Sequence, residues 1–78
     1  NNLENYSDNY IIIKDNNITF LKNNEYNITY INSNNINLSF NVKDNIQIKL
    51  FILSKDNTIK INNTYNLGEQ SSLLLFKL

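Results

Sequence analysis

The chain has 78 residues and a mass of 9.2 kDa, and its seven lysines balance seven acidic residues, so its formal net charge is zero. This length allows one small domain or a piece of a larger one and excludes an enzyme with separate cofactor and substrate lobes. The absence of Cys and His excludes disulfides, thiolate or imidazole zinc sites and Ser-His-Asp triads. No basic run favours nucleic acid, and no apolar stretch approaches the roughly 20 residues of a membrane span.

The composition is dominated by 19 Asn and 12 Ile, with no Ala, Arg, Pro, Met or Trp. The abundant residues have AT-rich codons, so an AT-biased genome explains most of this bias. A prion-like Asn-rich tract explains it less well, because Ile, Leu, Phe and Tyr interrupt the Asn residues at regular intervals. With no Met and no signal sequence at its start, the chain reads as a segment of a longer protein.

Alternating polar and apolar residues predict seven β-strands and no helix. In chain order the expected strands are Tyr10–Ile13, Ile18–Leu21, Tyr26–Ile31, Ile36–Val42, Ile46–Leu53, Thr58–Leu67 and Leu73–Leu78. β-branched and aromatic residues dominate them, which favours strands over helices. The breaks between them are short and rich in Asn and Asp, and Asn tolerates the left-handed backbone of a tight corner.

Four of these strands repeat a pattern of polar, aliphatic, polar and large apolar residues at a period of ten. The copies are Asn17–Phe20, Asn27–Tyr30, Asn37–Phe40 and Gln47–Leu50, and a fifth copy, Thr58–Ile61, comes one residue late. Similarity at a fixed period is typical of repeat architectures. Within each copy the apolar residues share one face, so each strand is expected to have one wet face.

Two architectures fit these strand and break lengths. An antiparallel meander or β-sandwich would use each break as a hairpin turn. A parallel β-helix would use each break as a corner, with alternate strands in two sheets and two strands per rung of about 20 residues. A shift of twenty places Ile18 beside Leu38 and Phe20 beside Phe40, like on like, which favours the β-helix. The C-terminal strands are apolar on both faces, so we expect further coils beyond Leu78.

The acidic residues fall mainly in the breaks, where turn chemistry alone explains them. They are Glu4, Asp8, Asp15, Glu25, Asp44, Asp56 and Glu69. No two of them stand at i, i+2 on a strand as a glycosidase pair, and neither Asp44-Asn45 nor Asp56-Asn57 continues into a calcium loop. The single glycine, Gly68, excludes a glycine-rich phosphate loop. We therefore expect no catalytic, metal-binding or cofactor-binding residue and no enzyme activity.

Two other features could serve recognition, and a simpler explanation is stronger for each. The glycosylation sequons at Asn5, Asn17, Asn27, Asn37 and Asn62 are close to the number that so much Asn, Ser and Thr yields by chance. Tyr6, Tyr10, Tyr26, Tyr30 and Tyr65 could form a stacking platform. Tyr30, however, fills the slot of Phe20 and Phe40, so core packing explains it. The outward lysines Lys49 and Lys60 are assigned to solubility, with no partner.

Residues 35–78 resemble the opening coils of the core domain in the SufB/SufD family, the scaffold proteins of the SUF iron-sulfur cluster assembly machinery. An alternating strand leads through Asp44-Asn45 into an apolar strand, then into Asn57–Ile61 and Leu67–Leu75. The last segment is similar to the family's aliphatic-Gly-Glu-x-small-x-Leu-x-Leu coil. Phe76-Lys77 stands where family members often have an acidic residue, which leaves the subtype open, and residues 1–34 match only in general strand character.

The resemblance implies a fragment of a right-handed parallel β-helix and a role as a structural scaffold. It implies a SufC-type ATPase and a related SufB/SufD-type subunit as partners, reached through parts of the protein outside this segment. The iron-sulfur cluster belongs to the whole complex, and none of the family's cluster-related Cys and His maps onto this chain. The implied location is the cytoplasm, or the plastid stroma of a plastid-bearing eukaryote. A secreted or surface β-solenoid or sandwich that adheres or binds glycans remains the alternative.

Overall fold

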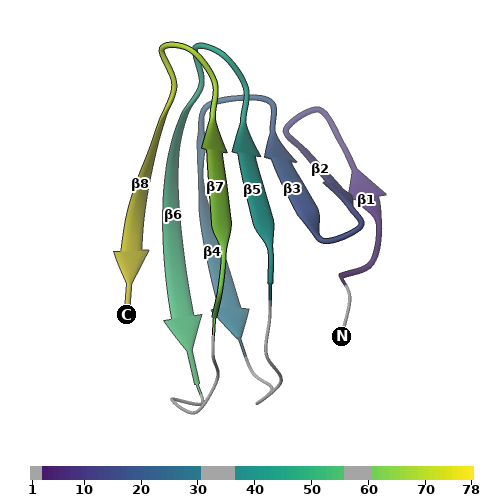
Figure 1. Cartoon of the computed structure of the whole chain (residues 1–78), viewed down its shortest axis with the longest axis vertical. Coiled ribbons are helices and arrows are strands. Elements are labelled where there is room, and N and C mark those ends of the chain that lie inside the picture. The colour runs from purple at the N-terminus through teal and green to yellow at the C-terminus, as the bar shows by residue number, and fades with distance from the viewer. Residues whose placement is uncertain (1–2, 31–36, 56–60) are drawn as a thin grey trace.

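The computed structural model describes residues 3–30, 37–55 and 61–78, which form eight β-strands (Figure 1). The strands are β1 (Tyr6–Ser7), β2 (Ile11–Lys14), β3 (Asn17–Phe20), β4 (Asn24–Tyr30), β5 (Ser39–Val42), β6 (Gln47–Ser54), β7 (Thr64–Leu67) and β8 (Ser72–Lys77). No helix occurs within these ranges, so the expected all-β class is confirmed for them.

Each of the seven predicted strands has an observed counterpart, and the predicted Ile36–Val42 is observed as β5, which begins only at Ser39. β1 was not predicted, because two residues are too few to show an alternating pattern. The predicted strand Thr58–Leu67 is observed as β7, which begins only at Thr64. Most of the fifth repeat copy lies outside the described residues.

The strands form two sheets, and from β3 onward the chain alternates between them. The first, sheet A, has the order β1-β2-β3-β5-β7, and the second, sheet B, has the order β4-β6-β8. β3, β5 and β7 are parallel to one another, and so are β4, β6 and β8. From β3 onward the chain therefore runs one way in sheet A and the opposite way in sheet B (Figure 1). The antiparallel meander describes only β1 to β3.

The expected register of twenty residues per rung is wrong. Asn17 pairs with Ser39 and Phe20 with Val42, which is an offset of 22 residues. The offset is 24 between β4 and β6, and 25 in the two later pairs. Phe20 and Phe40 still lie in the same sheet and on the same face, because an even offset preserves the alternation of side chains. The corners between strands vary in length, whereas the pattern within the strands does not. Twice the ten-residue period therefore underestimates the number of residues in a rung.

The core lies between the two sheets, and its nine buried side chains in the described part of the chain are apolar apart from the hydroxyl of Tyr30. Sheet A contributes a stack of parallel rings, in which the centroids of Phe20 and Phe40 are 6.2 Å apart and those of Phe40 and Tyr65 are 5.4 Å apart. Burying each large side chain contributes about 1.5–3 kcal/mol. The buried side chains are Ile18, Phe20, Tyr30, Leu38, Phe40, Val42, Ile48, Leu50 and Ile52. The inward positions expected from the repeat are thus confirmed.

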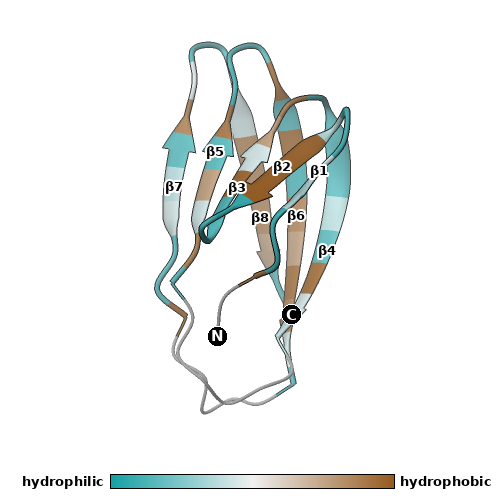
Figure 2. Cartoon of the chain, turned by 90° about the vertical axis from the view of Figure 1, so that its right-hand side faces the viewer, coloured by the Kyte–Doolittle hydropathy of each residue, from teal (hydrophilic) through white to brown (hydrophobic). Residues whose placement is uncertain are grey.

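An antiparallel hairpin continues sheet A at the N-terminal side of the core. β2 and β3 are joined by Asp15 and Asn16, both with positive φ (51° and 62°), which suits the two-residue turn that such a hairpin needs. Ile11 and Ile13 of β2 pack against the core cluster. In Figure 2, β1 and β2 cross obliquely in front of the parallel strands. The hairpin therefore covers this side of the core.

The corners that lead from sheet A to sheet B stack on one another. Asp44 Oδ1 accepts the N–H of Glu69 (2.8 Å), and Asn45 N–H donates to Glu69 O (2.9 Å). A Cβ on Gly68 would lie 2.4 Å from Asp44 Oδ1, so this corner needs glycine for space and not for a positive φ. Asn45 has a φ of 63°, as expected for an Asn that replaces glycine at a corner.

Candidate functional site

Within residues 3–30, 37–55 and 61–78, no group of three metal-ligating side chains comes together. The acidic side chains at the turns act on the backbone instead. Asp8 Oδ1 accepts the N–H groups of Tyr10 (2.7 Å) and Ile11 (2.8 Å) and so closes the turn before β2. Asp44 joins two corners, as described above. Turn chemistry therefore explains these two residues, as the sequence predicted. Asp56 lies outside the described residues.

The tyrosines do not form one platform. Tyr30 is buried in the core, and Tyr65 stacks on Phe40 on the inner face of sheet A. The ring centroids of Tyr26 and Phe20 are 4.8 Å apart. Tyr10 lies under the Lys22 ammonium at 5.3 Å from its ring centroid. Three of the five rings thus serve packing, which was the simpler explanation.

Four groups in the described part of the chain have a shifted pKa, and each shift moves the pKa farther from 7. The two backbone N–H groups that Asp8 accepts lower the pKa of its carboxyl, and the Asp8 carboxylate raises the pKa of Tyr6. Burial raises the pKa of Tyr26 and of Tyr30. None of these four groups becomes an acid or base suited to catalysis near pH 7.

The outer face of sheet A is polar in every parallel strand. Asn66 Nδ2 donates to Asn41 Oδ1 (2.8 Å), and Asn41 Nδ2 lies 3.5 Å from Thr19 Oγ1, which links β7, β5 and β3. We call this row the polar ladder, and its members are Asn17, Thr19, Ser39, Asn41, Thr64 and Asn66. Through Asn41, four of these side chains, those of Asn17, Thr19, Asn41 and Asn66, are linked by hydrogen bonds across the strands, and such cross-strand pairs stabilise a sheet.

The outer face of sheet B changes character between its first and last strands. On β4 it carries Glu25, Asn27 and Thr29, whereas on β6 and β8 it becomes apolar. We call this apolar region the apolar patch, and its members are Phe51, Leu53, Leu74, Phe76 and Leu78. Leu74 is 52% exposed and Leu78 is 75% exposed. Large apolar side chains that remain exposed together are a common sign of an interaction surface.

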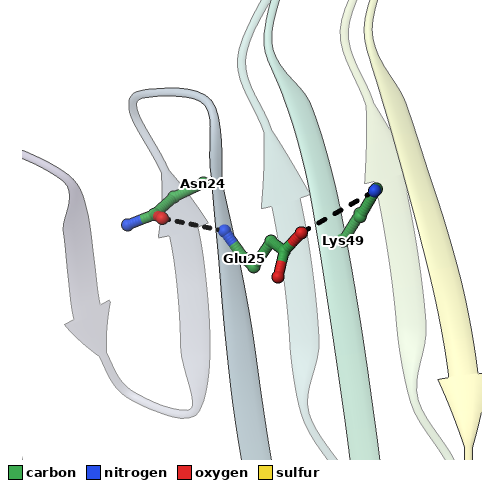
Figure 3. A network of polar contacts seen from close by, with 3 residues as sticks. All are labelled: Asn24, Glu25 and Lys49. Carbon is green, nitrogen blue, oxygen red and sulfur yellow. Dashed lines mark hydrogen bonds and ion pairs between the residues drawn. The ribbon is translucent and has the colours of Figure 1, made fainter.

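A shallow hollow adjoins the apolar patch where the strands of sheet B begin. It has a volume of about 300 Å³ and is lined by residues of all three strands, including Leu74 and Ser72 of β8. On its wall Lys49 Nζ lies 3.7 Å from Glu25 Oε1, and Asn24 Oδ1 accepts the Glu25 N–H at 2.9 Å (Figure 3). Both charged side chains are more than half exposed, so the pair contributes little to stability.

Sequence reasoning gave Lys49 no partner, and it missed the hollow. The reason is the rung length, because a register of twenty residues would have placed Lys49 beside Thr29 on β4. The observed offset of 24 residues places it beside Glu25 instead. The opposite charges of Glu25 and Lys49, 24 residues apart, were the feature of the sequence that could have revealed this pair. The other outward lysine, Lys60, lies outside the described residues.

The five sequon asparagines are all exposed, which does not alter the simpler explanation of these sequons by composition. In the described part of the chain, no helix has the length and apolar character needed to cross a membrane. In comparisons with known proteins, the chain matches no protein-family model, no curated protein and no solved structure.

Proposed function

We propose that this chain is a structural segment of a scaffold protein, a piece of a right-handed parallel β-helix of the SufB/SufD kind. The observation that carries the proposal is the unbroken parallel pairing of β3-β5-β7 and β4-β6-β8, with the chain changing sheet at each strand. Parallel strands need a crossover between them, and here the strand of the opposite sheet provides it. This is the arrangement that winding coils require.

The direction of winding supports the same proposal. Viewed as in Figure 2, the chain rises in sheet A on the left and descends in sheet B on the right, while later strands lie farther from the viewer. A path that turns clockwise as it recedes has a right-handed sense. Parallel crossovers in proteins share this handedness almost without exception.

The segment that carries the resemblance to SufB and SufD forms β5 to β8. In its Leu67-Gly68-Glu69 corner, the Gly68 N–H donates to Val42 O (2.8 Å), and the absent side chain of Gly68 leaves room for Asp44. The aliphatic-Gly-Glu order thus has a physical reason in this chain, because each of its last two residues contacts the preceding corner. This supports a stacked coil at that point and leaves the family itself a proposal.

As a scaffold segment, the chain would contribute a rigid support and no chemistry of its own. The complete protein would pair with a related subunit and with a SufC-type ATPase, and it would help to build or deliver iron-sulfur clusters. The clusters are the cargo of that complex, and no residue of this chain is proposed to bind them. Such a protein would work in the cytoplasm or in a plastid stroma.

Co-purification tests this proposal. The complete protein, tagged and expressed with a SufC-type ATPase from the same genome, should elute with that ATPase as one complex after size-exclusion chromatography. A tagged, unrelated β-rich protein expressed with the same ATPase is the control. Elution without the ATPase, or recovery of the protein from the culture medium with glycans attached, would contradict it and favour the adhesive or glycan-binding alternative.

A further inference from the structure

We propose that the apolar patch of sheet B docks an amphipathic helix of a partner protein, which places apolar side chains on the patch and carboxylates near the lysines around it. The inference depends on the outer face of β6 and β8 and not on the kinship with SufB and SufD. It would therefore stand if the ATPase failed to co-purify.

The apolar patch is specific to one face of the molecule. Across sheet B, the outward position at Asn27 becomes Phe51 on β6 and Phe76 on β8, and the position at Glu25 becomes Lys49 and then Leu74. In the parallel strands of sheet A, β3, β5 and β7, the outward positions stay polar. The repeat pattern alone therefore does not produce the patch, since it would leave polar residues at these outward positions.

The patch is also preorganised. The rings of Phe51 and Phe76 stack with centroids 4.8 Å apart and planes only 11° apart, so they form one flat surface held by the pairing of two parallel strands. A surface that is already ordered loses little conformational entropy when a partner covers it. This favours recognition by this face over a role in folding.

The area of the patch suits a single helix better than a second copy of the chain. Leu53, Leu74 and Phe76 are 37%, 52% and 39% exposed. Together they expose on the order of 250 Å², taking roughly 200 Å² for a large apolar side chain. A stable complex of two globular proteins buries about 800 Å² on each partner. These three side chains offer about a third of that.

The charges around the patch indicate an acidic partner. Lys49 and Lys55 flank Phe51 and Leu53 on β6 and at its end, and both lysines are exposed. Glu25 is the one acidic side chain paired with any of them among the described residues. A second copy of this face would bring like charges together, whereas a partner with carboxylates would complement them.

The backbone explains why the partner element should be a helix. A strand lying across the side chains of a sheet face would leave its own N–H and C=O groups without partners, whereas a helix satisfies its own.

Lys49 and Lys55 are six residues apart, which is about 20 Å along an extended strand. A helix of roughly four turns covers that length and can carry one carboxylate near each lysine. The hollow beside Lys49 and Leu74 would receive a side chain at one end of that helix.

A display library of helical peptides, with apolar and charged positions randomised, tests the inference against the complete protein. The expected peptides have Leu, Ile or Phe at helical spacing and an excess of Glu and Asp. For one such fluorescently labelled peptide, Leu74→Ser should raise the dissociation constant at least tenfold, about 1.4 kcal/mol. Reversing the peptide's acidic residues to Lys should weaken binding by a similar factor.

Leu3→Ser is the matched control, since Leu3 is 40% exposed and lies away from sheet B. It should leave peptide binding unchanged. If the circular dichroism spectrum of Leu74→Ser differs from that of the wild type, Leu74→Thr becomes the test variant instead, because Thr is a strand-forming residue. The inference is overturned by selected peptides that are basic, by equal binding to the Leu74 variant, or by an empty selection. It is also overturned if the protein sediments with phosphatidylserine vesicles without binding peptide, or dimerises through Leu74.

Discussion

Both sheets contain aromatic rings that stack between parallel strands, on the inner face in sheet A and on the outer face in sheet B. In sheet A, Phe20, Phe40 and Tyr65 stack on the inner face, and Phe20 and Phe40 are completely buried. In sheet B, Phe51 and Phe76 stack on the outer face, where Phe76 remains 39% exposed. The same contact should therefore stabilise the fold in sheet A and form a surface for recognition in sheet B. The difference lies in burial, since stacking alone contributes only about 0.5–1.5 kcal/mol per pair.

The inner and outer stacks can be separated by truncating one ring of each. We predict that Phe40→Ala lowers the free energy of unfolding by about 3–5 kcal/mol, because it leaves a cavity in the core. Phe76→Ala should cost less, about 1–2 kcal/mol, from its stack on Phe51 and from the partial burial of the ring. Urea unfolding followed by circular dichroism measures both. Equal losses would show that the outer stack is as important to folding as the inner one.

The second prediction concerns the corner that carries the chain from sheet A to sheet B. Gly68→Ala should lower the free energy of unfolding by about 1–3 kcal/mol, since the added methyl would overlap Asp44 Oδ1 and the backbone of Lys43. Gly68→Ala should cost less when it is added to the single variant Asp44→Ala than when it is added to the wild type, because Asp44→Ala removes the side-chain overlap and has already lost the hydrogen bond to the Glu69 N–H. Thermal unfolding of the three variants checks this. Wild-type stability of Gly68→Ala would mean that the corners do not stack this closely.

The third prediction compares polar side chains on the two outer faces. Asn41→Ala should cost about 1 kcal/mol, because Asn41 links Asn66 and Thr19 across the polar ladder. Lys49→Ala should cost less than about 0.5 kcal/mol, because its ion pair with Glu25 is exposed. Chemical unfolding in low and high salt distinguishes them, since only the ion pair is screened. A larger loss for Lys49→Ala would overturn the view that sheet B's outer face adds little stability.

The fourth and smallest effect comes from two tyrosines of β4. The Tyr30 hydroxyl lies 3.4 Å from Asn63 Nδ2, so Tyr30→Phe should destabilise by about 0.5–1 kcal/mol. The Tyr26 hydroxyl is buried and has no hydrogen-bond partner among the described residues. Tyr26→Phe should therefore leave stability unchanged or raise it by up to about 1 kcal/mol. Tyr30→Phe should lower the thermal midpoint and Tyr26→Phe should leave it equal or higher, and two equal losses would contradict the assignment.

The sequence predicted the strands and their inner faces because alternation is a local property. Ile18, Phe20, Leu38 and Phe40 are buried as their repeat indicated. The register was predicted wrongly, because it depends on corner lengths and on contacts such as Asp44 with Glu69, which a pattern of apolar residues does not encode. The error concealed the pair of Lys49 with Glu25. The strands β2 and β3 were predicted, but their antiparallel pairing was expected only under the meander alternative, since the β-helix treats every break as a corner.

The central claim, that β3, β5 and β7 are parallel neighbours in this register, can be tested by cross-linking, because the chain contains no cysteine. Asn41 and Asn66 are directly paired, and parallel strands lie about 4.8 Å apart, within the span of a disulfide. The double variant Asn41→Cys/Asn66→Cys should form an intramolecular disulfide on mild oxidation. Asn41→Cys/Ser72→Cys, with its two positions on the outer faces of different sheets, should not. A cross-link in the second variant and none in the first would contradict the parallel arrangement.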